Sequence, residues 1–227
     1  MRGGIVMRAS WIAVRGMARV EVLSQLGLSE TGAVAFHGPS YLTSAELPGG
    51  WCVVSAEEFD RFEPGVAAAL SDTGDVITGK LTDVAMFSEA SLYSSGRAMW
   101  TVSRDVEKKP RDLLVTGEPP PVLAEIRGRL KAAQAGETDE VDHLFDAPME
   151  LSAALCGFRP DSARLPAETV FHELTPTKSL GKDGGAALRA NNEALGSAVQ
   201  QDIHRLAQEL GFEPVVLRPE HNVYSFG

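Results

Sequence analysis

The stretch between residues 76 and 103 constrains the fold most, because it is a run of short extended segments separated by turns. The segments are 76–81, 84–87, 90–93 and 98–103. The last two flank the residues SSGR at 94–97, which are typical of a tight hairpin turn. A hairpin joins antiparallel strands, so the stretch predicts an antiparallel sheet.

The final segment also shows which side chains face the core. Trp100 and Val102 share one side of the strand, whereas Met99, Thr101 and Ser103 share the other. Such alternation is typical of a half-buried antiparallel strand, and it places Trp100 in the core. We expect Trp51 and Val53 to occupy equivalent positions on the strand at 51–55.

Three helices are predicted to pack on this sheet, at residues 17–26, 122–135 and 188–210. Val20 and Leu23 should face inward in the first, and Leu123, Ile126 and Leu130 in the second. Shorter helices are expected at 66–70 and 148–155, the latter ending at Gly157. The predicted class is α+β, a mainly antiparallel sheet packed against several helices.

Further strands are expected before and after the stretch at 76–103. They are 11–14, 33–36, 51–55, 113–116, 215–217 and 223–226. Segments 33–36 and 51–55 should be antiparallel neighbours.

The sequence predicts a core domain over residues 1–160 and a C-terminal helix with strands over 186–227. Residues 161–185 lack periodicity and gather prolines and glycines, so they are predicted to be a loop or linker. Residues 176–185 should be mobile, and Met7 is a plausible alternative start.

The charge of the chain limits the classes of binding partner that it could have. The net charge of −10 argues against duplex nucleic acid and against an anionic membrane surface, both of which favour clustered Lys and Arg. A basic protein fits better. Between residues 137 and 150 all charged side chains are acidic: Glu137, Asp139, Glu140, Asp142, Asp146 and Glu150. We expect Glu137, Asp139, Glu140 and Asp142 to form a binding surface.

Cys52 and Cys156 lie between apolar residues and are expected to be buried free thiols. The N-terminal apolar runs are short and interrupted by Arg, which does not resemble a signal peptide. A cytoplasmic location is therefore expected.

The five histidines do not show zinc-site spacing, and no metal or cofactor is expected. His172-Glu173 resembles the start of a metalloprotease helix, but Pro176 stands where its second histidine would be. On a helix, Asp139 with His143 and Asp142 with Asp146 would share faces and could bind a metal. The alternative is a polar connection in which Asp146 caps the helix before Pro148.

A glycine-rich loop at 180–185 departs from a phosphate-binding loop, because Asp183 replaces the required Ser or Thr. Neither cysteine and no serine lies in a known nucleophile motif.

Four stretches, SWIAVRG, LPGGW, SLYSSGRAMWTVSRD and DHLFDAPMELSAALCGFR, resemble an uncharacterised family of small bacterial cytoplasmic proteins. The resemblance covers residues 10–160 and implies no catalytic residue.

Two function classes remain. The leading one is a non-enzymatic protein-binding module that neutralises a basic effector, as an immunity protein does. The alternative is a small hydrolase or transferase that uses His143, His172, Asp146 and Glu173 across a cleft. Acidic mimicry of a nucleic acid is a third interpretation. The sequence does not indicate an oligomeric state.

Overall fold

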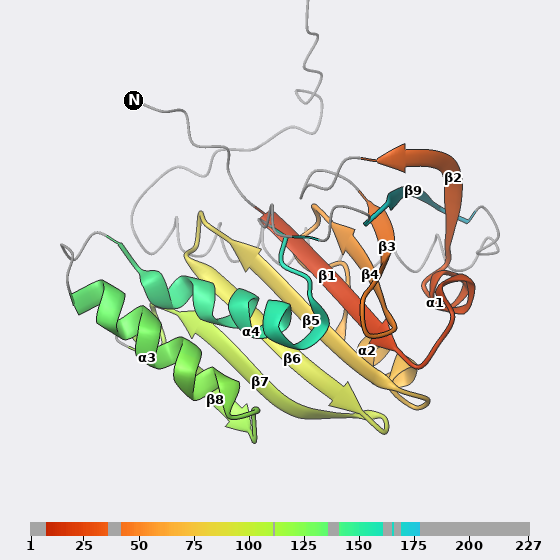
Figure 1. Ribbon diagram of the computed structural model, residues 1–227. Coiled ribbons are helices and arrows are strands. Elements are labelled where there is room, and N and C mark those ends of the chain that lie inside the picture. Colours follow the sequence, from red (N-terminus) through yellow and green to blue (C-terminus); the bar gives the residue numbers. More distant parts are fainter. Residues whose placement is uncertain are drawn as a thin grey trace, which may run out of the picture. The chain divides into compact units, whose positions relative to one another are not determined.

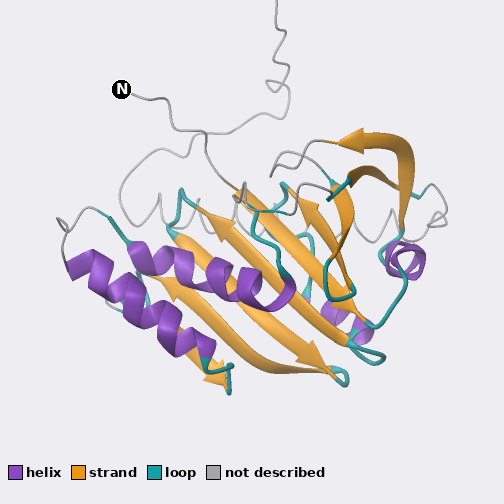
Figure 2. Ribbon diagram, viewed as in Figure 1, coloured by secondary structure: helices purple, strands orange, loops and turns teal. Residues whose placement is uncertain are grey.

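The computed structural model describes residues 8–35, 42–110, 112–135, 141–160, 165 and 169–177. The chain divides into two units, Met1–Thr177 and Lys178–Gly227, and the described residues all belong to the first. An antiparallel sheet of nine strands, in the order β2-β9-β3-β4-β1-β5-β6-β7-β8, dominates that unit (Figures 1 and 2). Its strands are β1 (Arg8–Arg15), β2 (Leu28–Ala35), β3 (Thr43–Leu47), β4 (Trp51–Ala56), β5 (Asp75–Thr82), β6 (Phe87–Ser94), β7 (Arg97–Asp105), β8 (Leu114–Gly117) and β9 (Phe171–Pro176). The described helices are α1 (Arg19–Gln25), α2 (Pro64–Leu70), α3 (Val122–Ala135), the 3-10 helix η1 (His143–Asp146) and α4 (Ala147–Cys156).

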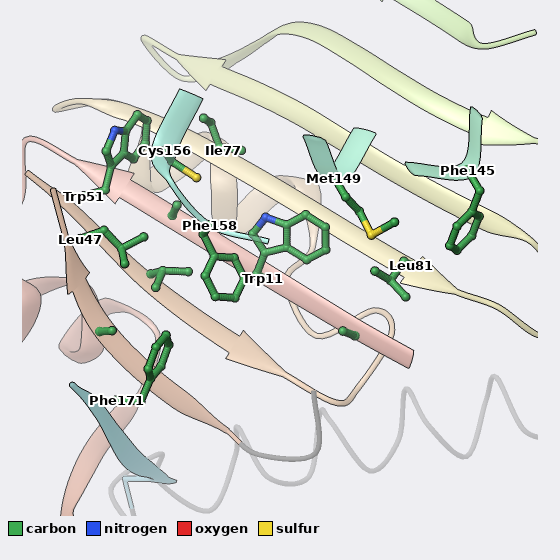
Figure 3. Packing of buried hydrophobic residues seen from close by; sticks show 14 residues of the cluster. Trp11, Leu47, Trp51, Ile77, Leu81, Phe145, Met149, Cys156, Phe158 and Phe171 are labelled. Carbon is green, nitrogen blue, oxygen red and sulfur yellow. The ribbon is translucent and has the colours of Figure 1, made fainter. Parts of the chain in front are cut away.

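One face of the sheet, which we call the α3/α4 face, carries most of the aromatic core. Trp11 of β1 and Ile77 of β5 belong to one cluster with Met149 and Phe158 (Figure 3). Val53 of β4 is buried in the same cluster. Farther along the sheet, the same face packs against α3 and α4 (Figure 1). Trp100 and Val102 are buried there, as predicted.

The opposite face, the α1/α2 face, is covered at one end by the two short helices. Ile12, Val14 and Val76 pack there against Val22 of α1 and Leu70 of α2. Toward the other end of β5 and β6 this face becomes polar. The sheet therefore has one mainly apolar face, which also buries Ser88 and Arg104, and one face that is apolar at one end and polar at the other.

The predicted hairpin between β6 and β7 is confirmed. Ser94 pairs with Arg97, which leaves Ser95 and Gly96 as a two-residue turn. Their φ angles are 51° and 73°, the combination that a type I′ turn requires.

Two predicted helices have the expected form. α3 has the predicted bounds and buries Leu123, Ile126 and Leu130. α4 ends at Gly157, whose φ of 79° gives the left-handed cap.

The inward face of α1 differs from the prediction at one residue. Leu23 is buried as predicted, but Val20 is 74% exposed and Val22 is buried instead. The helix has seven residues, so its contact with the sheet sets its orientation more than a long periodic pattern does.

Two strand predictions also need correction. β2, which contains residues 33–35 of the first predicted segment, and β4, which contains 51–55, are not neighbours, because β4 pairs with β3 and β1. The sequence pattern missed β3, which places polar Thr43 and Ser44 at fully buried positions. The predicted strand at 84–87 is mostly a turn, in which Met86 has a φ of 46°.

The predicted linker at 161–185 contains a strand. β9 lies between β2 and β3, with Phe171 on the α3/α4 face and Leu174 on the other. Two polar residues separate these apolar ones, so β9 lacks a clear two-residue period. The core unit therefore extends past residue 160.

The predicted helix at 188–210, the strands at 215–217 and 223–226, residues 178–185 of the predicted mobile loop and the alternative start at Met7 lie outside the described residues. Within the described part of the chain, the helices are too short or too polar to span a membrane.

Candidate functional site

The predicted acidic surface is only partly described. Glu137, Asp139 and Glu140 lie outside the described residues. The remaining acids of the run meet arginines from elsewhere in the chain: Asp142 meets Arg104, Asp146 meets Arg159, and Glu150 meets both Arg129 and Arg159. This half of the run is therefore neutralised in space, although it is purely acidic in sequence.

Asp142 is not a surface carboxylate, contrary to expectation. Its Oδ2 accepts a hydrogen bond from Arg104 Nε at 2.6 Å, and the two side chains are 14% and 4% exposed. Its Oδ1 accepts from the backbone N–H of Leu144 and caps η1. Arg104 also donates to the carbonyls of Lys109 and Pro110, so the pair joins η1 to the β7–β8 connection.

Asp146 stands at the predicted N-cap position of α4, but its side chain makes no capping hydrogen bond. The carboxylate lies 3.3 Å from Arg159 instead. The predicted helical pairing of Asp142 with Asp146 also fails, because residues 143–146 form a 3-10 helix.

The predicted catalytic residues are not brought together. His143 and Asp146 lie on η1, which is fixed to β6 by a hydrogen bond from Ser88 Oγ to the Phe145 carbonyl. His172 and Glu173 lie on β9, five strand positions from β6, or about 24 Å at the usual strand spacing.

His172 and Glu173 also point to opposite faces of the sheet, since they are adjacent on a strand. His172 Nδ1 is 3.9 Å from Glu30, and Glu30 is 2.9 Å from Arg19. The described residues thus give no shared cleft for these four groups.

The two cysteine thiols, those of Cys52 and Cys156, are free and buried. Burial raises the pKa of Cys52 to about 12 and also raises the pKa of Cys156. Both remain protonated near neutral pH, which confirms the prediction of buried free cysteines. In the described ranges, no group of three or more His, Cys, Asp or Glu residues could hold a metal ion.

A different site appears on the polar part of the α1/α2 face. It is a recess of about 40 Å³ between the loop at 57–63 and strands β1, β5 and β6. We call it the Glu89 recess. Its described lining residues are Ser10, Phe59, Phe62, Pro64, Thr78, Gly79, Lys80, Glu89 and Tyr93.

Strand register builds the floor of the recess. Ser10 of β1 is opposite Lys80 of β5, and Lys80 is opposite Glu89 of β6. The three side chains therefore form a row across three strands on one face. Ser10 Oγ donates to the Glu58 carbonyl, which fixes the loop over this row.

Lys80 has several neighbours in this arrangement. Its Nζ lies 2.8 Å from Asp60 Oδ1 and 5.0 Å from the centroid of Phe59. It also lies 5.8 Å from the centroid of Phe87, whose ring meets Phe59 edge-on. A carboxylate and two aromatic faces thus hold the lysine ammonium.

Glu89 differs from the paired carboxylates around it. Burial raises the pKa of Glu89, although the positive charge of Lys80 opposes the shift. Among the described residues, its carboxylate forms neither a hydrogen bond nor an ion pair. Burial also raises the pKa of Tyr93, and the negative charge of Glu89 adds to that shift.

The sequence contains a pattern that indicates this site, but the predicted strands divide it into two segments. Phe87, Glu89, Ser91 and Tyr93 alternate along β6, but separate segments at 84–87 and 90–93 left Glu89 between them. One continuous strand would have placed Glu89 opposite Lys80.

Comparisons with protein-family models, with curated proteins and with solved structures find no match to this chain. Its own geometry defines a sheet-dominated α+β protein with a small charged recess beside one face of the sheet.

Proposed function

We propose that the protein is a non-enzymatic protein-binding module for a basic partner, and that its contact surface includes the Glu89 recess. The observation that carries this proposal is the Glu89 carboxylate, partly buried and without a described partner. A partly desolvated charge of this kind costs free energy in the isolated protein, and a complementary charge on a partner offsets that cost.

The size of the recess supports binding of a side-chain end group over binding of a whole substrate. Ligand pockets usually enclose about 300–1,000 Å³. A volume of about 40 Å³ admits a few water molecules or one small polar group.

The overall charge supports the same partner class. The net charge of −10 attracts a cationic protein over distance and speeds its association. Neutralisation of a basic effector, such as a secreted toxin, is one function that such a module performs. Because Asp142 is engaged by Arg104, the contact proposed among the described residues is the recess, while the contribution of Glu137, Asp139 and Glu140 stays a prediction.

The test is an affinity capture from native lysate with three baits: wild type, Glu89→Gln and Glu125→Gln. Glu125 is exposed on α3, over the opposite face of the sheet, so its variant matches the loss of charge without touching the recess. We expect one stoichiometric basic protein on wild type and on Glu125→Gln, and loss of it on Glu89→Gln.

The captured protein is then purified and its association rate measured at several salt concentrations. We expect faster association at low salt. Capture of the same proteins in equal amounts by all three baits would overturn the proposal.

A further inference from the structure

The charged groups that act on Glu89 show which of them lacks a partner. They are Lys80 on β5, Asp60 on the loop and Lys108 on the β7–β8 connection, and the neutral phenol of Tyr93 lies beside them on β6. Lys80 is paired with Asp60, and Lys108 lies 3.0 Å from Asp105. Elsewhere in the loop, Arg61 pairs with Glu58. Among these described groups, Glu89 is the charge left unmatched.

The walls of the recess suit a cation. Phe59, Phe62 and Tyr93 line it together with the Glu89 carboxylate. The negative face of an aromatic ring attracts ammonium and guanidinium groups, as the contact of Lys80 with Phe59 already shows. The carboxylate and the aromatic rings therefore both favour a positively charged occupant.

Other occupants fit less well. An anion would meet the Glu89 carboxylate, while Lys80 is held by Asp60. An apolar group would remove the remaining water from Glu89 and supply no charge in return. A cation alone offsets the burial of the carboxylate.

We infer that the Glu89 recess binds the ammonium or guanidinium end of one basic side chain of the partner protein. This inference rests on the proposed binding function and names the chemical group that the surface recognises. Binding selects the ionised form of Glu89, so the recess releases a proton when a cation enters a protonated site. Affinity therefore rises with pH until Glu89 is ionised in the free protein.

The test uses ¹³C NMR of the Glu89 side-chain carboxyl in the full chain, with N-acetyl-arginine methylamide as the probe. N-acetyl-citrulline methylamide is the matched control, because citrulline has nearly the shape of arginine without its charge. We expect saturable shifts with millimolar arginine probe and a lower pKa for Glu89 in its presence, with neither effect from the citrulline probe.

The same titration on variants locates the site. Glu89→Gln should weaken binding of the arginine probe about tenfold or more, monitored through the backbone signals of β5 and β6. Glu125→Gln should bind like wild type. Equal responses to both probes, or unchanged affinity in Glu89→Gln, would overturn the inference.

The two proposals can fail separately. If the lysate partner depends on Glu89 but the Glu89 signal ignores the arginine probe, the binding function stands and the cation site is wrong. If the probe binds as expected but no captured protein depends on Glu89, the cation site stands and the proposed function is wrong.

Discussion

Trp11 and Gly79 illustrate how one residue fixes the identity of another across the sheet. They are register partners on β1 and β5, and the Trp11 side chain is fully buried. A Cβ at Gly79 would lie 2.0 Å from Cζ2 of the Trp11 indole. The indole also donates a hydrogen bond from Nε1 to Ser152 Oγ of α4 at 2.9 Å, so it cannot easily move away.

Gly79→Ala should therefore destabilise the protein by about 1–3 kcal/mol through overpacking. The matched control is Gly128→Ala on α3, where an added Cβ meets no atom within 4 Å. Alanine in a helix interior is about 1 kcal/mol more favourable than glycine, so the control should be neutral or stabilising. Urea denaturation of both variants gives the comparison.

A smaller residue at position 11 provides the second check. In a Trp11→Leu background the penalty of Gly79→Ala should shrink, because the clashing ring is gone. An unchanged penalty in that background would mean that Gly79 is needed for another reason.

At this scale the sequence predicted burial well where alternation was strong. Trp100 and Val102 are buried as expected. It failed for Val20 and did not single out Glu89, since the environment of each depends on neighbours distant in the sequence. The need for glycine at position 79 has the same origin, because it depends on an aromatic ring 68 residues earlier in the chain.

At the scale of elements, a buried ion pair fastens the β7–β8 connection to η1. Arg104 lies at the end of β7 and is 3% exposed. It donates to three backbone carbonyls of the connection, those of Lys109, Pro110 and Asp112, and to the Asp142 carboxylate. Its guanidinium thus replaces the sheet hydrogen bonds that this irregular segment lacks.

Asp142→Ala should destabilise the protein by about 3–5 kcal/mol, because it leaves the Arg104 charge buried without its counterion. The control is Arg127→Ala, which breaks an ion pair with Asp112 in which the arginine side chain is 45% exposed. That change should cost less than about 1 kcal/mol. Thermal and chemical denaturation of the two variants measures the difference.

The double variant Arg104→Met with Asp142→Leu should recover part of the loss, since it removes both charges together. If Asp142→Ala unfolds at the same denaturant concentration as wild type, the pair is not a structural anchor.

The acidic run at 137–150 shows why the sequence alone does not predict the ion pairs of η1 and α4. Asp142 is separated from Arg104 by 38 residues, and Glu150 from Arg129 by 21. A charge count along the chain cannot include partners that only the fold brings near. Neutralising Glu137, Asp139 and Glu140 is a different experiment from neutralising Asp142, although the sequence groups all four.

At the scale of the whole unit, the last described strand completes the first part of the sheet. β9 lies between β2 and β3, which belong to the first fifty residues. It pairs with β2 from Leu28↔Pro176 to Ala35↔Phe171, with a register shift, and with β3 at Thr43 and Ser44. Pairing over such a distance leaves little local signal, so the sequence pattern predicts a linker where the structure has a strand.

This topology predicts where the chain can be shortened. A chain that ends after Thr177 keeps the nine described strands and should unfold cooperatively in urea. A chain that ends after Pro160 loses β9 and leaves β2 without its described strand partner. It also exposes the apolar surfaces against which Phe171 and Leu174 pack; these two residues are themselves only 3% and 7% exposed. Burying each of these side chains is worth about 1.5–3 kcal/mol, so their joint loss is a large fraction of the stability of a typical domain. We expect the shorter chain to have a lower midpoint and a smaller urea m-value, because less surface is buried before unfolding.

Phe171→Ala in the chain that ends after Thr177 separates the loss of a side chain from the loss of the strand. It should lower the midpoint by the cavity cost of about 3–5 kcal/mol while leaving the m-value unchanged. If the chain ending after Pro160 instead matches the one ending after Thr177 in both midpoint and m-value, β9 contributes nothing to the folded sheet and the core unit ends at residue 160 after all.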